Sequence, residues 1–169
     1  MSGDKPFFRF NPRAYELGSF EPSDLPCQVC GRACVWKYTG SVYCIEEIDP
    51  VCARCISDGR LGEAVQDGDY SLHDVDLDDA DPELADEVLK RTPDFSTFNP
   101  FEWPVVDGEP LAFVGYGDDM ILWNDPAVKE AIIRMSEGAG FGTPDAPMGY
   151  ALVFRRLNGG DYIATLDLD

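Results

Sequence analysis

The most regular pattern of apolar positions lies in the C-terminal half of the chain. After Asn124-Asp125-Pro126, apolar residues at positions 128, 131, 132 and 135 follow an i, i+3, i+4, i+7 spacing, which predicts an amphipathic helix that ends near Gly138. Compact apolar runs at 111–114, 149–154 and 162–166 predict strands. The last two runs flank the segment Asn-Gly-Gly-Asp at 158–161, a turn sequence that favours a β-hairpin.

The N-terminal half has shorter apolar segments. Residues 7–10, Phe-Phe-Arg-Phe, are predicted to form a short strand. Residues 35–38 and 42–45 predict a hairpin around a turn at 39–41. A helix is expected to begin at Asp81-Pro82 and to end before Thr92-Pro93, because proline disfavours helical geometry in the preceding residue. The aspartate- and glycine-rich segment 66–80 predicts an acidic loop.

Together these elements predict an α+β fold. We expect a small four-cysteine zinc-ribbon module near the N-terminus, attached to a mixed α/β core. The chain has 169 residues and 44% hydrophobic residues, enough to bury a core of its own. Two organisations are consistent with this length. Either residues 1–65 hold the ribbon (about 25–60) and residues 66–169 form an acidic α+β domain, or the whole chain is one compact unit.

Two CxxC pairs are the most informative motif. Cys27 and Cys30 form the first pair, Cys52 and Cys55 the second, and 21 residues separate the two. Each pair can place two thiolates on one metal ion, and two pairs supply the four sulfur ligands of tetrahedral zinc. Gly31 follows the first pair and Gly59 comes shortly after the second, at positions where a chain that wraps a metal often needs a positive φ. The sequence therefore predicts a Zn²⁺ site.

Disulfides and buried thiols are the alternatives to a metal. Residues 1–6 show no signal-peptide pattern, so we expect a cytoplasmic protein with reduced thiols and no membrane insertion. Paired cysteines in that compartment favour a metal. Four cysteines leave no coordination position for water or substrate, so the zinc is expected to be structural. Cys34 and Cys44 remain outside the pairs, and packing as thiols is their favoured role.

The distribution of charge argues against nucleic-acid binding, a common role of zinc ribbons. The formal charge of −19 is concentrated in residues 61–128, which hold 18 acidic and two basic residues. Nucleic-acid-binding proteins instead concentrate Lys and Arg where they meet phosphates. We therefore expect no nucleic-acid partner.

An acidic surface favours a basic protein partner, which it would attract electrostatically. The alternative is a solvated acidic face that maintains solubility. Six aspartates of the acidic loop are the candidate partner-binding residues: Asp67, Asp69, Asp74, Asp76, Asp78 and Asp79.

Signals for catalysis are weak, so an enzyme is the less favoured class and no catalytic residue is predicted. His73, the only histidine, lies in the acidic loop and is expected to be solvated. No P-loop, dinucleotide fingerprint or nucleophile elbow is present. The alternative function is an enzyme or small-molecule-binding protein with a carboxylate and aromatic pocket in the core domain. Asp118 and Asp119 are its candidate carboxylates, and three aromatic residues are candidates for its lining: Trp103, Phe113 and Trp123.

The cysteine motifs and several flanking segments resemble the CbrC family of bacterial proteins. The most specific part is the order of CxxCG at 27–31 and CxxCIxDG at 52–59, and the segments 38–43, 91–95 and 150–155 extend the match. The resemblance implies a poorly characterised protein without established enzymatic activity, named for tolerance to a colicin. It would make the basic partner a toxin.

Two departures from the CbrC pattern narrow the metal hypothesis. Family members commonly carry Cys-Leu-His-Cys-Gly near the C-terminus, where residues 156–160 read Arg-Leu-Asn-Gly-Gly. The family's His-Cys after the tryptophan is also absent, around Val105-Val106-Asp107. Only the two CxxC pairs therefore remain as predicted ligands.

Overall fold

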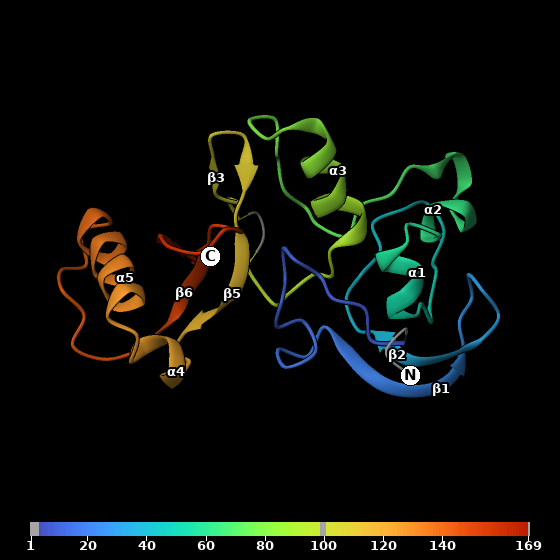
Figure 1. The fold of residues 1–169 in the computed structure, drawn as a ribbon, viewed down its shortest axis with the longest axis horizontal. Coiled ribbons are helices and arrows are strands. Elements are labelled where there is room, and N and C mark those ends of the chain that lie inside the picture. Colours follow the sequence, from blue (N-terminus) through green and yellow to red (C-terminus); the bar gives the residue numbers. More distant parts are fainter. Residues whose placement is uncertain (1–3, 99–100, 169) are drawn as a thin grey trace. The chain divides into compact units, whose positions relative to one another are not determined.

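The computed structural model of the chain describes residues 4–98 and 101–168. Its contacts divide the chain into two compact units (Figure 1). The first comprises Met1–Asp74 with Pro82–Ser96, and the second comprises Val75–Asp81 with Thr97–Asp169. Residues 66–74 and the helix after the acidic loop are thus grouped with the cysteine-containing segment. Each unit is described by itself below.

The first unit combines one two-stranded sheet with short helices. Strands β1 and β2 pair antiparallel, with Phe20 opposite Tyr38 and Pro22 opposite Trp36. Helix α3 begins at a proline and ends before Thr92-Pro93, as predicted. The elements in chain order are β1 Phe20–Pro26, β2 Ala33–Tyr38, α1 Ala53–Ser57, α2 Leu61–Ala64, the 3₁₀ helix η2 Gln66–Gly68 and α3 Pro82–Arg91.

Aromatic side chains and cysteines share the core of this unit. Phe8 stacks on Phe20 with ring centroids 5.4 Å apart, and Tyr15 stacks on Phe20 at 4.9 Å. Cys27, Cys52 and Cys55 are buried in the same cluster as these rings. The cysteines are therefore part of the packed interior, so a change in their chemistry affects the fold of the unit.

Two predicted elements of the first unit are wrong. β2 pairs with β1, whereas residues 42–45 form only a bridge from Tyr43 to Ser71. Segment 7–10 forms no strand, and residues 8–11 form a turn in which the Asn11 amide donates to the Phe8 carbonyl at 3.1 Å. Phe8 and Phe10 are buried there without a pairing strand. In both cases, local apolar alternation does not specify the hydrogen-bonding partner.

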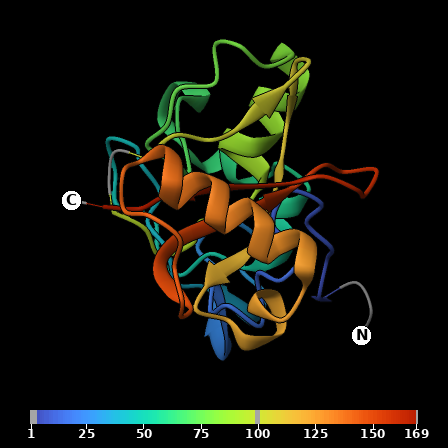
Figure 2. The same ribbon diagram turned by 90° about the vertical axis from the view of Figure 1, so that its left-hand side faces the viewer.

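The second unit is built on a three-stranded antiparallel sheet in the order β5-β6-β7. Helix α5 packs against β7 and covers one face of the sheet (Figure 2). The structure confirms the predicted helix that ends near Gly138, the predicted strand at 111–114 and the C-terminal hairpin. The elements are β3 Val105–Val106, β4 Glu109–Pro110, β5 Ala112–Gly117, α4 Met120–Trp123, α5 Pro126–Gly138, β6 Met148–Arg155 and β7 Tyr162–Leu166.

Capping and close packing explain where the elements of this unit begin and end. The Asp125 side chain accepts a hydrogen bond from the Ala127 amide and so caps α5, with Pro126 in the first turn. Asp119 caps α4 in the same way through the Ile121 amide. Gly117 ends β5 where a Cβ atom would lie 2.6 Å from the Met148 carbonyl oxygen, so only glycine fits.

The predicted fold class is confirmed as a mixture of helices and strands with the four cysteines near the N-terminus. Among the described residues, no helix has the length and apolar character needed to cross a bilayer.

Candidate metal centre

Two turns bring the CxxC pairs together in the first unit. Cys27 follows directly after β1, and Cys30 lies in the turn between β1 and β2. This turn is closed by the Gly31 amide, which donates to the Cys27 carbonyl at 2.8 Å, and Gly31 has the predicted positive φ of 71°. Cys52 is the N-cap residue of α1, and Cys55 lies within the helix. The second pair thus sits on the first turn of a helix.

The four sulfur atoms converge on one point. All four Sγ atoms lie within 4.8 Å of one another, with Cys27 to Cys55 and Cys30 to Cys52 both at 4.0 Å. A tetrahedron with metal–sulfur bonds of about 2.3 Å has sulfur–sulfur edges of about 3.8 Å. A disulfide would need a sulfur separation of about 2.05 Å. The separations therefore fit four thiolates around one ion, and the cysteines are unpaired.

The pKa values of the cluster show that its thiols resist losing all their protons together. Burial by itself raises the pKa of Cys27, but hydrogen bonds from the backbone amides of Cys30, Cys52 and Val29 outweigh burial and lower it to about 7. Burial raises the pKa of both Cys52 and Cys55, and the negative charge of neighbouring sulfurs raises them further. One thiolate forms readily, whereas four together require a positive ion that compensates their charge.

The two remaining cysteines lie outside the cluster. Cys34 is buried in the core of the first unit, where burial and then the charges of Cys27 and Cys52 raise its pKa to about 12. Cys44 is half-buried, and its thiol donates to the Glu46 carbonyl at 2.8 Å. Both are free thiols, which is consistent with the prediction that they pack as thiols.

Comparison with known proteins identifies the family. Residues 6–138 match the uncharacterised protein family UPF0167. The chain belongs to UPF0167. It is 35% identical over 120 residues to UPF0167 protein PA1536 of Pseudomonas aeruginosa, an alignment that covers 68% of this chain and 65% of the relative. It is 32% identical over 115 residues to UPF0167 protein Mb2317 of Mycobacterium bovis, which covers 65% of this chain and 59% of the relative.

These alignments span less than two thirds of the length of either UPF0167 relative. No solved structure matches the chain significantly.

The assignment to the CbrC family is wrong, because both the matched family and its curated relatives are UPF0167. The motifs that suggested CbrC are CxxC turns with a following glycine. The geometry of metal chelation dictates such motifs. They therefore indicate the kind of site more reliably than they indicate the family. Colicin tolerance rested on the CbrC resemblance and loses its support with it.

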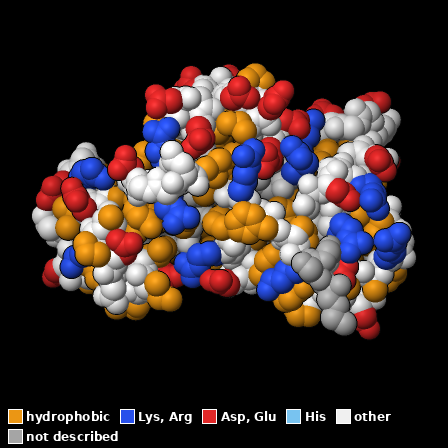
Figure 3. All heavy atoms as spheres, viewed as in Figure 1, with side chains coloured by type: hydrophobic (Ala, Val, Ile, Leu, Met, Phe, Trp, Pro, Cys, Tyr) orange, Lys and Arg blue, Asp and Glu red, His pale blue; other side chains and the backbone are white. Residues whose placement is uncertain are grey.

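The six candidate partner-binding aspartates are all exposed. Three belong to the first unit and three to the second, and Figure 3 shows exposed acidic side chains on both units. In the second unit, Asp76, Asp78 and Asp79 line a cavity of about 490 Å³ together with Glu102 and Trp103. Among the other candidates, Asp119 caps α4, and Phe113 and Trp123 are buried in the core.

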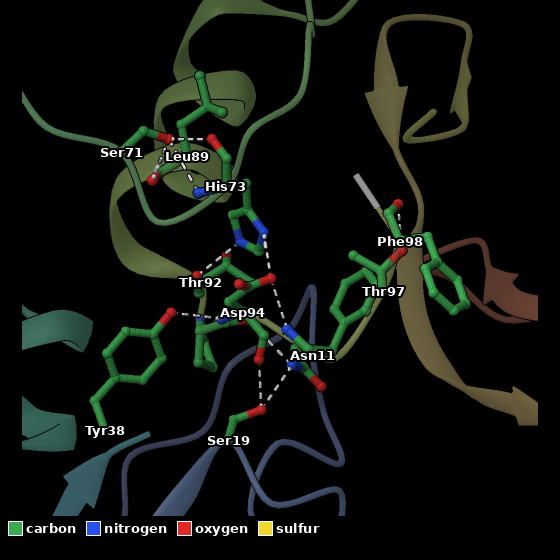
Figure 4. Close-up of polar contacts among 12 residues, drawn as sticks. Asn11, Ser19, Tyr38, Ser71, His73, Leu89, Thr92, Asp94, Thr97 and Phe98 are labelled. Carbon is green, nitrogen blue, oxygen red and sulfur yellow. Dashed lines mark hydrogen bonds and ion pairs between the residues drawn. The ribbon is translucent and has the colours of Figure 1, made fainter. Parts of the chain in front are cut away.

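Sequence reasoning missed a buried polar network around His73 in the first unit (Figure 4). The prediction that His73 is solvated is wrong, since the residue is only 3% exposed. Its Nε2 atom lies 2.9 Å from the Thr92 carbonyl oxygen, and its Nδ1 atom lies 3.4 Å from Asp94 Oδ1. A carbonyl oxygen can only accept, so Nε2 carries the proton and donates. The acidic residues beside His73 in the sequence gave no signal of this burial.

The backbone around Asp94 is held by several side chains of the same network. Ser19 Oγ donates to the Asp94 carbonyl at 2.6 Å, and the Asp94 amide donates to the Tyr38 hydroxyl oxygen at 3.1 Å. Asn11 Nδ2 donates to the Pro93 carbonyl at 3.1 Å. Burial raises the pKa of Tyr38, and the charge of Asp94 adds to the effect. The network fixes the chain that follows α3 against β2 and the N-terminal turn.

Proposed function

We propose that this UPF0167 protein binds one zinc ion through Cys27, Cys30, Cys52 and Cys55, and that the ion holds the first unit together. The observation that carries this proposal is the convergence of four sulfur atoms within 4.8 Å. Zinc is favoured because it accepts four thiolates in a tetrahedron. The ion would join the β1–β2 turn to the first turn of α1, two segments that are far apart in the sequence.

A structural role follows from the ligand count and from burial. Four protein ligands complete the tetrahedron, so no position remains for a substrate or an activated water molecule. Three of the four cysteines are buried in the core of the first unit. The ion would therefore contribute to folding, as closed thiolate sites do.

Metal analysis of the purified full-length protein tests this proposal. We expect about one equivalent of zinc per chain, and cobalt substitution should give the visible d–d bands of a tetrahedral thiolate site. Less than about half an equivalent of any metal, with oxidised thiols, would contradict the proposal. Iron in place of zinc would support a metal site at these four cysteines but would contradict zinc as its ion.

We further propose that the part of the acidic loop that belongs to the second unit binds a basic segment of a partner protein. The supporting observation is the cavity lined by Asp76, Asp78, Asp79 and Glu102, whose lining contains no Lys or Arg. A lysine or arginine side chain entering it would meet several carboxylates and the ring of Trp103.

Titration with hexalysine at low and moderate salt tests the acidic surface. Asp76→Asn/Asp78→Asn/Asp79→Asn should weaken binding at least about fivefold, because it removes three charges from the cavity. The matched control Asp118→Asn/Glu130→Gln/Asp145→Asn removes three exposed charges elsewhere on the second unit. An equal loss of hexalysine affinity in both triple variants would show that only net charge matters, and it would refute a specific site.

A further inference from the structure

A second cavity of the second unit is lined by arginines, in contrast to the carboxylate-lined cavity of the acidic loop. It has a volume of about 510 Å³, within the range of small-molecule sites, and lies beside α5 and β7. Ala131 and Met135 of α5 face it, and Ile163 and Ala164 of β7 contribute further apolar wall. Arg134 and Arg156 also line it. The cavity therefore combines apolar walls with two positively charged side chains.

Two arginines in one cavity stand out against the charge of this unit. The sequence of the second unit contains 16 acidic residues and only four basic ones. Half of these basic residues, Arg134 and Arg156, line this one cavity. The only carboxylate in its lining is Asp161. Two guanidinium groups in one cavity can attract an anion locally, although the whole protein repels it.

The side chains of these two arginines donate no hydrogen bond within the described residues, although Arg156 is ion-paired with Asp107 and Glu109. Within residues 4–98 and 101–168, Arg134 makes no hydrogen bond or ion pair. Arg156 lies 3.6 Å from Asp107 and 4.0 Å from Glu109, both too long for hydrogen bonds. Its Nε atom is buried with no hydrogen-bond partner among the described residues. Because an unpaired buried donor is costly, a bound acceptor would offset this cost.

We propose that this cavity binds a small carboxylate with an apolar body. The carboxylate would pair with Arg134 and Arg156, whose planar guanidinium groups match its two oxygens. The apolar body would lie along Met135 and Ile163. A single negative charge is favoured over a phosphate dianion, because Asp161 and the carboxylates near Arg156 repel a second charge. This site is independent of the proposed zinc centre.

Titration of the ¹⁵N-labelled full-length protein with octanoate tests the site by NMR. We expect binding with a dissociation constant below about 1 mM and shifts centred on the amides of Ala131, Met135, Ile163 and Ala164. Octylamine has the same apolar chain and the opposite charge, so it should not shift these amides. Inorganic phosphate should bind more weakly than octanoate.

Charge variants decide whether the arginines recognise the carboxylate. Arg134→Gln and Arg156→Gln should each weaken octanoate binding about tenfold or more. Lys129→Gln is the matched control, since Lys129 lies on the same helix with its Nζ over the Trp123 ring and does not line the cavity. It should change the affinity less than twofold.

Several results would overturn the proposal: no shifts at these amides, equal binding of octylamine, tighter binding of phosphate, or unchanged affinity in Arg134→Gln. Arg134 is exposed, so its substitution is expected to leave the fold intact. This variant therefore decides the test even if Arg156→Gln unfolds.

Discussion

Replacing Cys55 by serine is expected to release the zinc and to unfold the first unit at 25 °C. Cys55 is fully buried, and its Sγ atom lies 4.0 Å from Cys27 Sγ. Serine removes one thiolate ligand and leaves a polar hydroxyl in the core. Structural zinc sites contribute on the order of 10 kcal/mol to folding, whereas a whole domain is stable by only about 5–15 kcal/mol. The free energy lost with the zinc should therefore exceed the free energy of unfolding of this unit.

Cys44→Ser is the matched control for this experiment. Cys44 lies outside the cluster, and a serine hydroxyl can still donate to the Glu46 carbonyl. Zinc content and the NMR spectrum should be measured for both variants, with the amides of Ile56, Leu61 and Tyr70 as reporters of the first unit. A Cys55→Ser protein that keeps these signals without bound metal would show that the ion is dispensable for the fold.

The cysteine cluster could be predicted from the sequence because the chelating turn is a local motif. Each CxxC pair places two thiols on one side of a turn, and the glycine after Cys30 has the required positive φ. The partner of β2 could not be predicted in the same way. β1 contains Pro22 and Pro26 and does not have the apolar alternation of a strand. The apolar segment at 42–45 was the more obvious candidate, although it does not pair with β2.

Local signals also explain why the elements of the second unit were predictable. The Asp125-Pro126 start of α5 and the glycine turn between β6 and β7 act over a few residues. The arginine-lined cavity has no such local signal. Arg134 and Arg156 are 22 residues apart in the sequence and come together only when α5 packs on β7. Sites assembled from separate elements require the tertiary structure.

His73 shows the same limitation for a single residue. Its sequence neighbour Asp74 is exposed, whereas the His73 ring turns inward to Thr92 and Asp94. These partners lie 19 and 21 residues further along the chain, beyond α3. The ring therefore connects the acidic loop to the segment that follows the helix. Sequence composition near His73 describes the loop surface and carries no information about this contact.

Replacing His73 by alanine should lower the free energy of unfolding by about 3 kcal/mol, from the cavity that it leaves and from the unpaired Thr92 carbonyl. His73→Phe fills the volume but cannot donate, so we expect a smaller loss of about 1–2 kcal/mol. Asp74→Ala, at the exposed neighbour, should change stability by less than about 0.5 kcal/mol. Urea unfolding of the zinc-loaded protein measures all three. Equal stabilities of the His73→Ala and Asp74→Ala proteins would show that the buried network does not hold the loop to the segment after α3.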